Sequence, residues 1–486
     1  MRFLFDHPLL IVMAAVSGVI LHGLLSTWAQ STSVVTRFGL VQLRLGKMAV
    51  PMTLIVLAIA YLWPASFYPY MNNGAIGDMF IFLRMAVTEG MAVHARHFSF
   101  PLVLQAMLAA FNWAGLIDSG NAMYLETVAS IGSWPARAMV FGSIIFWLGT
   151  LRRRGVAGIG LILQTLFLGF SYFAWAWGIQ PNAIGIMIGF QILTAAFWLH
   201  WTQSGALKWL LAFSFSFCVS IFAHISSLFF AFGSGVAALF WIFSKLPRSN
   251  RVRSLAALGS VSVGLGLVFY SISLADMIRV APGSPRTLPG VLVFLSDPAT
   301  VGYPDWNPLH WLIPAKTNLV TSIQNIFNYW APKSIFDSAW IFLEIAALVG
   351  LLRACLRRKE IDRELFLFGA ITSFICFIGF LPRAAGTHYY STAGLANFCL
   401  LAGLVFIPVR GTSEIAKRHE FVEAAFATLL VFAMAGYSGF SNWRVTQASS
   451  MDHLELYSSS KKIQAALGTA KDVSVLTIHY DPYLFS

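Results

Sequence analysis

Asp78 is the residue whose type and position most clearly suggest chemistry. It follows the stretch Gly74-Ala-Ile-Gly77, just after an apolar segment ends, so its carboxylate is expected where the chain leaves the membrane. A carboxylate at such a boundary, beside apolar side chains, can accept a proton from a hydroxyl group. An aspartate directly after a glycine also suits the cap of a following helix. The sequence leaves both roles open, and one side chain could serve in both.

Further ionisable residues follow Asp78 on the same segment, and they are Arg84, Glu89, His94, Arg96 and His97. The two histidines flank an arginine at a spacing that could hold a metal ion or a phosphate. Because no aspartate or cysteine ligand set stands nearby, contact with phosphate or lipid headgroups is favoured. The glutamate either pairs with a basic neighbour or is solvated. We predict candidate substrate contacts here and no metal site, with a divalent cation left open as a cofactor but not favoured.

Acid-x-acid triplets are the usual means of binding a nucleotide sugar through a divalent cation. They occur only in Glu360-Ile-Asp362-Arg-Glu364. Basic neighbours place this stretch on the cytoplasmic side, where we interpret it as a solvated loop. The chain has no Walker loop, dinucleotide fingerprint or metalloprotease motif. A substrate that carries its own activation is therefore favoured.

The elements that position these residues are predicted to be membrane helices. The chain of 486 residues is 58% hydrophobic and 11% charged, against about 25% charged residues in soluble domains. This excludes a soluble globular protein and indicates an all-α polytopic membrane protein. The net charge of +12 comes from basic residues in short clusters between apolar runs. Such clusters indicate the topology of a membrane protein, and membrane lipids are its expected surroundings. No nucleic-acid partner is predicted.

A membrane helix needs about 20 mostly apolar residues, because lipid cannot satisfy an open backbone. We predict about 12 transmembrane helices, near residues 8–29, 48–67, 133–150, 156–174, 182–200, 208–225, 227–244, 255–274, 336–353, 365–381, 389–408 and 421–440. The first run could instead be a removed signal sequence. It is long and lacks a small-x-small cleavage site, which favours a retained helix.

Basic clusters such as Arg152–Arg154 alternate with long loops that are poor in basic residues, so the long loops are predicted to be extracytoplasmic. The predicted organisation begins with an extra N-terminal helix and a cytoplasmic loop, residues 1–47. A transmembrane domain follows over residues 48–440, and it includes two long extracytoplasmic loops at 68–132 and 275–335. A small α/β extracytoplasmic tail covers residues 441–486. Within the first loop, helices over 78–90 and 101–116 are expected to lie in the membrane interface.

Several motifs occur along the chain in a recognisable order. Asp78 is followed by Ala86, by Gly90 and by the Phe100-Pro101 pair that opens an interface helix. Further features are Arg152–Arg154, Gly178-Ile-Gln-Pro-Asn182, His224 and Leu381-Pro-Arg383-Ala-Ala-Gly-Thr-His388-Tyr389-Tyr390. This set resembles the lipid-linked-sugar-dependent glycosyltransferases of the GT-C fold, in particular bacterial members similar to the protein O-mannosyltransferases and to the lipid A aminoarabinose transferase. The resemblance covers about residues 48–486.

The chain departs from this pattern at two places. Many relatives have two adjacent acids in the first loop, whereas Met79 follows Asp78 here, which weakens a metal-bridging proposal. Many also have lysine where this chain has His224. That histidine stands at the outer end of a helical hairpin, where it is either a candidate substrate contact or a turn residue with its own hydrogen bonds.

The resemblance implies that Asp78 is the general base of an inverting displacement on a polyprenyl-phosphate sugar. It implies that Arg383, His388 and Tyr389 bind the donor phosphate, a task that suits the fork of arginine. Alternatively, Arg383 extends to lipid headgroups and the tyrosines form an interfacial aromatic belt. The acceptor would be an envelope glycolipid, lipopolysaccharide, polysaccharide or protein. The site would face the periplasm from the bacterial inner membrane.

Two other functions are weighed against this one. An O-antigen polymerase or ligase would need Arg279, Arg286 and Arg383, and Asp78 would be dispensable. A secondary transporter would show duplicated halves and ionisable groups at mid-membrane. The sequence shows no such repeat, and its polar residues gather at one predicted surface.

Overall fold

The computed structural model describes most of residues 51–61, and then residues 99–116, 124–154, 156, 159–179, 182–296, 307–327, 362–382 and 386–405. Every regular element within these ranges is a helix. The predicted helices at 8–29, 336–353 and 421–440, the helix over 78–90 and the α/β tail lie outside them. The predicted total of 12 spans is therefore not tested by these ranges.

Five described helices are long and apolar enough to cross a membrane. The elements that contain them are α6 Tyr124–Arg153, α9 Ala183–Ser204, α11 Leu228–Lys245 with the preceding turn η1 Ile225–Ser227, α12 Arg248–Val280 and α17 Arg363–Phe380. Shorter elements are α5 Ser99–Trp113, α7 Ile159–Gly169, α8 Tyr172–Gly178, α10 Leu207–Ala223, α13 Leu288–Ser296, η2 Pro308–Trp311, α15 Leu312–Phe327 and α18 Gly386–Val405. The chain is a multi-pass integral membrane protein.

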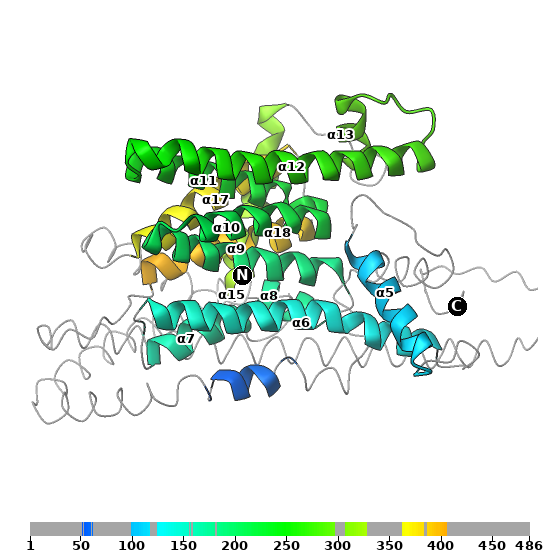
Figure 1. The fold of residues 1–486 in the computed structure, drawn as a ribbon, viewed down its shortest axis with the longest axis horizontal. Coiled ribbons are helices and arrows are strands. Elements are labelled where there is room, and N and C mark those ends of the chain that lie inside the picture. The colour runs from blue at the N-terminus through cyan, green and yellow to red at the C-terminus, as the bar shows by residue number, and fades with distance from the viewer. Residues whose placement is uncertain are drawn as a thin grey trace, which may run out of the picture.

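The helices form a bundle in which α9 lies at the centre, with α6 and α10 packed against it (Figure 1). Helix α17 packs on both α11 and α18. An aromatic cluster fills the middle, where the ring centroid of Trp198 lies 5.6 Å from that of Trp201 and 5.5 Å from that of Phe368. Burial of such large rings is a main source of packing energy in a bundle.

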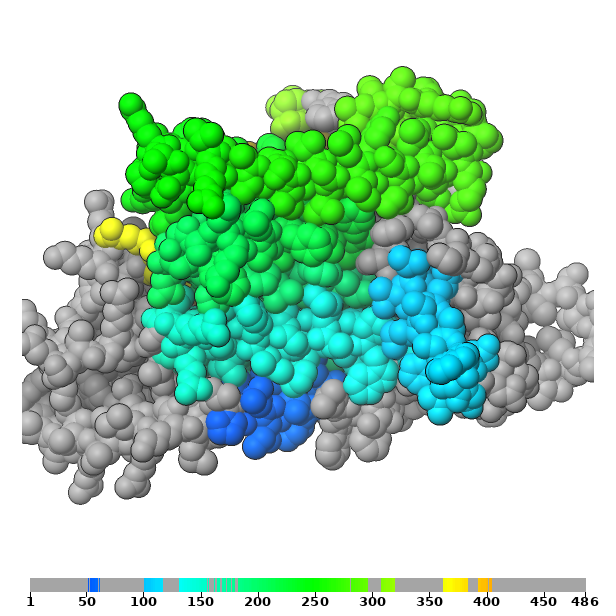
Figure 2. Space-filling model, in the orientation of Figure 1, coloured from blue at the N-terminus to red at the C-terminus, as the bar shows by residue number. Residues whose placement is uncertain are grey.

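Helix α12 lies along one side of the bundle against α10 and α11 (Figures 1 and 2). Only 11% of its most apolar window is buried inside the protein. Exposed Val263, Leu267 and Val268 give it a hydrocarbon surface that suits contact with lipid tails. The helix begins at Arg248, earlier than the predicted start at residue 255. Arg248, Arg251 and Arg253 therefore lie in its first turns and not in a loop.

The predicted membrane helix over 156–174 is two short helices. Helix α7 ends at Gly169, and α8 begins at Tyr172. At the break the hydroxyl of Ser171 donates to the carbonyl of Leu168, and the hydroxyl of Tyr61 donates to the carbonyl of Gly169 at 2.8 Å. The Leu168 carbonyl also accepts from the backbone N–H of Ser171 at 3.2 Å, and the Tyr61 hydroxyl supplies a side-chain donor to the Gly169 carbonyl at the interruption.

The predicted interface helix of the first loop is present as α5. Its Phe100 and Leu104 are buried in the bundle core, whereas Trp113 at the other end is 91% exposed. Figure 1 shows α5 crossing the bundle at the end where α6 begins. An apolar helix across the end of a bundle, with one exposed tryptophan, suits the membrane interface.

Candidate functional site

His224 connects α10 to α11 at a sharp turn. Its backbone is extended, with φ −155° and ψ 128°, and so it ends α10 and precedes η1. Nδ1 of its ring accepts a hydrogen bond from the backbone N–H of Ser226 at 3.1 Å and lies 2.8 Å from the Ser226 hydroxyl. The ring therefore caps the turn, as the turn alternative from the sequence predicts. Its role as a substrate contact stays a prediction.

Ser226 extends the contact from His224 to helix α18. The hydroxyl of Thr392 in α18 donates to the Ser226 hydroxyl at 2.9 Å. Thr392 stands one helical turn after His388 on the same helix. The turn at His224 and the first turns of α18 therefore lie at the same end of the bundle, although more than 160 residues separate them in the sequence.

A second layer of polar side chains lies beneath this contact. Gln191 in α9 donates to the Ser227 hydroxyl at 3.1 Å and to the Thr392 carbonyl at 3.4 Å, and the hydroxyls of Ser220 and Ser227 are 2.7 Å apart. All four of these side chains are buried. Hydrogen bonds inside an apolar bundle fix the positions of their helices, because an unpaired polar group there is costly.

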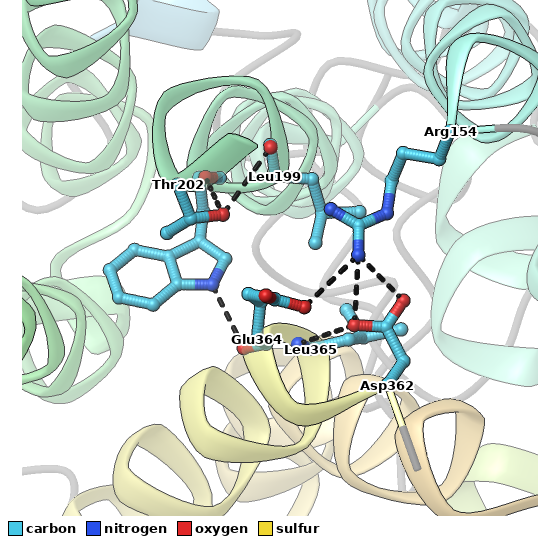
Figure 3. A network of polar contacts seen from close by, with 7 residues as sticks. Arg154, Leu199, Thr202, Asp362, Glu364 and Leu365 are labelled. Carbon is cyan, nitrogen blue, oxygen red and sulfur yellow. Dashed lines mark hydrogen bonds and ion pairs between the residues drawn. The ribbon is translucent and has the colours of Figure 1, made fainter. Parts of the chain in front are cut away.

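The opposite end of the bundle carries an ion-pair cluster, shown in Figure 3. Arg154, just after α6, lies 3.0 Å from Asp362 and 3.2 Å from Glu364. Asp362 caps α17 by accepting from the N–H of Leu365, and the Trp198 indole donates to the Glu364 carbonyl. The interpretation of this acidic stretch as a solvated loop is wrong for Asp362. Its side chain is only 8% exposed, because it pairs across the bundle with Arg154.

Burial raises the pKa of the Asp362 carboxyl above its ordinary value, and the Arg154 guanidinium opposes that rise. No three histidine, cysteine, aspartate or glutamate side chains gather into a metal-binding cluster within the described ranges. The ion pairs at this end tie the end of α6 to the start of α17 (Figure 3). We therefore regard this cluster as structural.

The chain was compared with known proteins by sequence and by fold. No protein-family model and no curated protein matches the chain. Among solved structures, ArnT from Cupriavidus metallidurans bound to undecaprenyl phosphate is similar over 90% of this chain and 83% of that one. The TM-score is 0.53 and the sequence identity is 12%. The chain has a GT-C fold.

Two archaeal structures with this fold are also similar, at lower scores. One is the Archaeoglobus fulgidus oligosaccharyltransferase in the apo form, with a TM-score of 0.48 and 11% sequence identity. The other is the oligosaccharyltransferase AglB from the same organism in complex with an inhibitory peptide and a dolichol-phosphate, with a TM-score of 0.46 and 10% sequence identity. They match 88% and 83% of this chain. The chain spans 59% and 56% of their lengths.

Some of the residues predicted from the GT-C resemblance fall inside the described ranges. His388 and Tyr389 belong to the first turn of α18, on the helix that Thr392 links to the His224 turn. Asp78, Arg84, Glu89, His94, Arg96, His97 and Arg383 lie outside those ranges. Their roles stay predictions.

The segment predicted to be the second long loop, residues 275–335, contains helices that the sequence did not predict. They include α13 and α15, and α15 packs against α18 and α8. At the end of α12, Arg279 pairs with the buried carboxylate of Asp276 at 2.9 Å. In this structure the guanidinium of Arg279 is therefore engaged in an ion pair with Asp276 on the same helix.

Arg137 is a functional candidate that sequence reasoning missed. It lies near the middle of α6 and is 1% exposed. Its guanidinium donates to the carbonyls of Ile179 at 2.8 Å and Tyr61 at 3.3 Å. The available signal was an arginine within an otherwise apolar helix, and such a residue in a membrane segment is a candidate for function by default.

Proposed function

We propose that the chain is an integral-membrane glycosyltransferase that moves a sugar from a polyprenyl-phosphate donor to an envelope acceptor on the extracytoplasmic face. The supporting observation is its fold, shared over 90% of its length with ArnT, whose structure contains undecaprenyl phosphate. A lipid-linked sugar carries its own activation, which agrees with the lack of a nucleotide-binding motif in the sequence. We place the protein in a bacterial inner membrane, with the site facing the periplasm.

Asp78 is the proposed general base. Its carboxylate takes the proton of an acceptor hydroxyl as the hydroxyl oxygen attacks the anomeric carbon of the donor sugar. The bond from that carbon to the phosphate oxygen breaks, and polyprenyl phosphate leaves with the electron pair. A single displacement inverts the anomeric configuration. The proton then passes from Asp78 to solvent, so the products are a glycoside and polyprenyl phosphate.

Arg383, His388 and Tyr389 are the proposed phosphate-binding residues. The leaving phosphate gains negative charge as the bond breaks, and a guanidinium fork with two further donors stabilises that charge. In support, the structure places positions 388 and 389 in the first turn of α18. The contact of Thr392 with Ser226, and through it with His224, holds this turn against the end of α10. Catalytic donors act best when such surrounding contacts fix their positions.

The proposal is tested with the purified full-length protein in detergent. It is incubated with a panel of polyprenyl-phosphate sugars and an envelope extract as acceptor. We expect time-dependent release of polyprenyl phosphate, and a product whose anomeric configuration is opposite to that of the donor. Release without inversion would contradict the single displacement. Lack of release with every donor, by protein that unfolds cooperatively, would contradict the glycosyltransferase assignment itself.

A further inference from the structure

Four basic side chains gather at the turn between α11 and α12. Lys245 ends α11, and Arg248, Arg251 and Arg253 lie in the first two turns of α12. All of them are exposed except Arg251, which is partly buried. In the part of the chain that the structure describes, no carboxylate lies within ion-pair distance of any of the four. We call them the α12 cation group.

The sequence around this group offers it no acidic partner. From residue 127 to residue 275 the chain contains neither aspartate nor glutamate. The carboxylates that open α17, Asp362 and Glu364, lie against Arg154 instead. Like charges that gather without an acidic neighbour repel one another, so an anion bound among them lowers their electrostatic free energy.

Arg251 is fixed in position by the turn beside it. Its Nε donates to the carbonyl of Leu246 at 2.9 Å, which uses one donor of the guanidinium and leaves the two terminal nitrogens for an anion. The fork of an arginine binds phosphate oxygens through paired N–H groups. Because this side chain is already held, less entropy is lost when an anion binds to it.

The cations continue into an apolar stripe on the exposed side of α12, the helix on the outer side of the bundle in Figure 2. At helical spacing Arg248, Val252, Val263 and Leu267 lie along one face. Val252 is 74% exposed, and Val263 and Leu267 are each 62% exposed. Val252 and Val263 are about 16 Å apart along the helix, close to the hydrocarbon depth of one leaflet, about 15 Å.

We propose that the α12 cation group and this stripe bind one anionic phospholipid of the surrounding leaflet. The lipid phosphate contacts Arg248 and Arg251, which are neighbours at a spacing of three residues, and Lys245 adds charge from the end of α11. The acyl chains lie along Val252 and Val263. A zwitterionic phospholipid has the same chains but carries a cation of its own, so it gains less from this site.

The site lies far from the turn at His224. Helix α11 begins beside that turn and ends at Lys245, so the α12 cation group is at the opposite end of the bundle. Lipid binding there is measured without sugar transfer. Failure of the proposed function would therefore leave this inference standing, and the reverse also holds.

The test uses full-length protein, purified in detergent and freed of co-purified lipid. Dioleoyl phosphatidylglycerol or dioleoyl phosphatidylcholine is added in steps, and bound lipid is counted by native mass spectrometry. The variant is Lys245→Gln with Arg248→Gln, two exposed positions. The matched control is Arg152→Gln with Arg153→Gln, which removes two exposed charges from α6, across the bundle from α12 (Figure 1).

We expect the wild type to bind one phosphatidylglycerol at least about tenfold more tightly than phosphatidylcholine. Each cation beside an anionic headgroup contributes about fivefold in affinity, so the variant should bind phosphatidylglycerol at least about tenfold more weakly. Its affinity for phosphatidylcholine and its thermal midpoint should not change, and the control should match the wild type. Added sodium chloride should weaken phosphatidylglycerol binding, because salt screens exposed charges.

A soluble phosphate is the other source of the same anion. Glycerol 3-phosphate in about 100-fold excess over lipid should leave phosphatidylglycerol bound, because it lacks the acyl chains that contact the stripe. Displacement by glycerol 3-phosphate would overturn the assignment to a lipid. Equal wild-type affinity for the two phospholipids would overturn it as well. Equal losses in the variant and the control would show that net charge alone attracts the lipid, without a site at α12.

Discussion

At the scale of single residues, the buried Arg137 in α6 and the partly buried Arg154 just after it have different environments. Arg154 faces two carboxylates, whereas Arg137 faces backbone carbonyls. Loss of Arg154 leaves a carboxylate without its cation, whereas loss of Arg137 leaves two backbone carbonyls without their side-chain donor. The same substitution at the two positions should therefore lower stability for different reasons.

Arg154→Met is expected to destabilise the protein by about 3 kcal/mol, because Asp362 is left buried without its cation. Denaturant unfolding in detergent measures this loss. Arg152→Met on the exposed face of α6 serves as the control and should change little. The double substitution Arg154→Met with Asp362→Asn should regain part of the loss, because asparagine still caps α17 but carries no charge.

The loss in Arg154→Met should depend on pH. Arg154 opposes the effect of burial on the pKa of Asp362, so its removal raises the folded-state pKa further. A raised pKa means that folding favours the protonated acid. The stability that Arg154→Met loses relative to the wild type is therefore largest above the folded-state pKa of Asp362, and it becomes smaller as the pH falls through that pKa. A stability loss that grows toward acid pH would contradict this explanation.

His224→Ala should cost about 1 kcal/mol, because the N–H of Ser226 loses its acceptor. His224→Asn should retain most of the stability, since an asparagine oxygen can cap the same turn. If His224 serves only the turn, both variants should also transfer sugar at rates that follow their stability. A folded His224→Asn protein with turnover reduced more than about tenfold would assign the ring a direct role with the substrate.

At the scale of elements, helices α17 and α18 depend on two glycines for their close packing. A Cβ at Gly369 would meet the backbone of Leu400, and a Cβ at Gly403 would lie 2.6 Å from the backbone nitrogen of Phe366. Small residues at such crossings let membrane helices approach closely. The N–H of Asp362 also donates to the Gly403 carbonyl, which joins this crossing to the ion-pair cluster.

Gly369→Leu should therefore separate α17 from α18 and lower stability by about 2 kcal/mol. Because α18 carries positions 388 and 389, sugar transfer should fall as well. Gly264→Ala, where a Cβ meets nothing within 4 Å, should leave thermal unfolding and transfer unchanged. Equal thermal midpoints for Gly369→Leu and the wild type would show that the crossing tolerates a large side chain.

The sequence predicts most of the described helices because lipid demands long apolar runs of closed backbone. The break in 156–174 was missed because Gly169 and Ser171 are single small residues that do not interrupt the apolar run. Tyr61, from a distant segment, makes the hydrogen bond that accompanies it. Helix α15 was missed because its 16 residues are too few for a span and follow a stretch rich in proline and tryptophan.

At the scale of the whole molecule, the GT-C resemblance read from loose motifs agrees with the fold. The site is only partly predictable from the sequence. Motif spacing singles out Asp78 and Arg383, but no local pattern joins Ser226 to Thr392 or Arg137 to Ile179. Those contacts exist only once distant helices have packed, so side-chain type alone could not reveal them.

Reporter fusions test the predicted orientation of the molecule. A fusion at residue 155 should report from the cytoplasm, because it follows the basic cluster Arg152–Arg154. Fusions at residues 300 and 460 should report from the opposite side. A cytoplasmic signal at residue 300 would overturn the assignment of the long loops and, with it, the proposed location of the active site.

The central claim is that Asp78 takes the proton in a sugar transfer from a lipid carrier. Its most direct test is release of polyprenyl phosphate from a purified lipid-linked sugar by Asp78→Asn protein in detergent. Glu360→Gln, which the sequence predicts to lie on the cytoplasmic side, is the matched control. We predict that Asp78→Asn binds the donor with little change, unfolds at the wild-type temperature and loses at least about 100-fold in turnover. Turnover equal to that of the wild type in the folded Asp78→Asn protein would contradict the account.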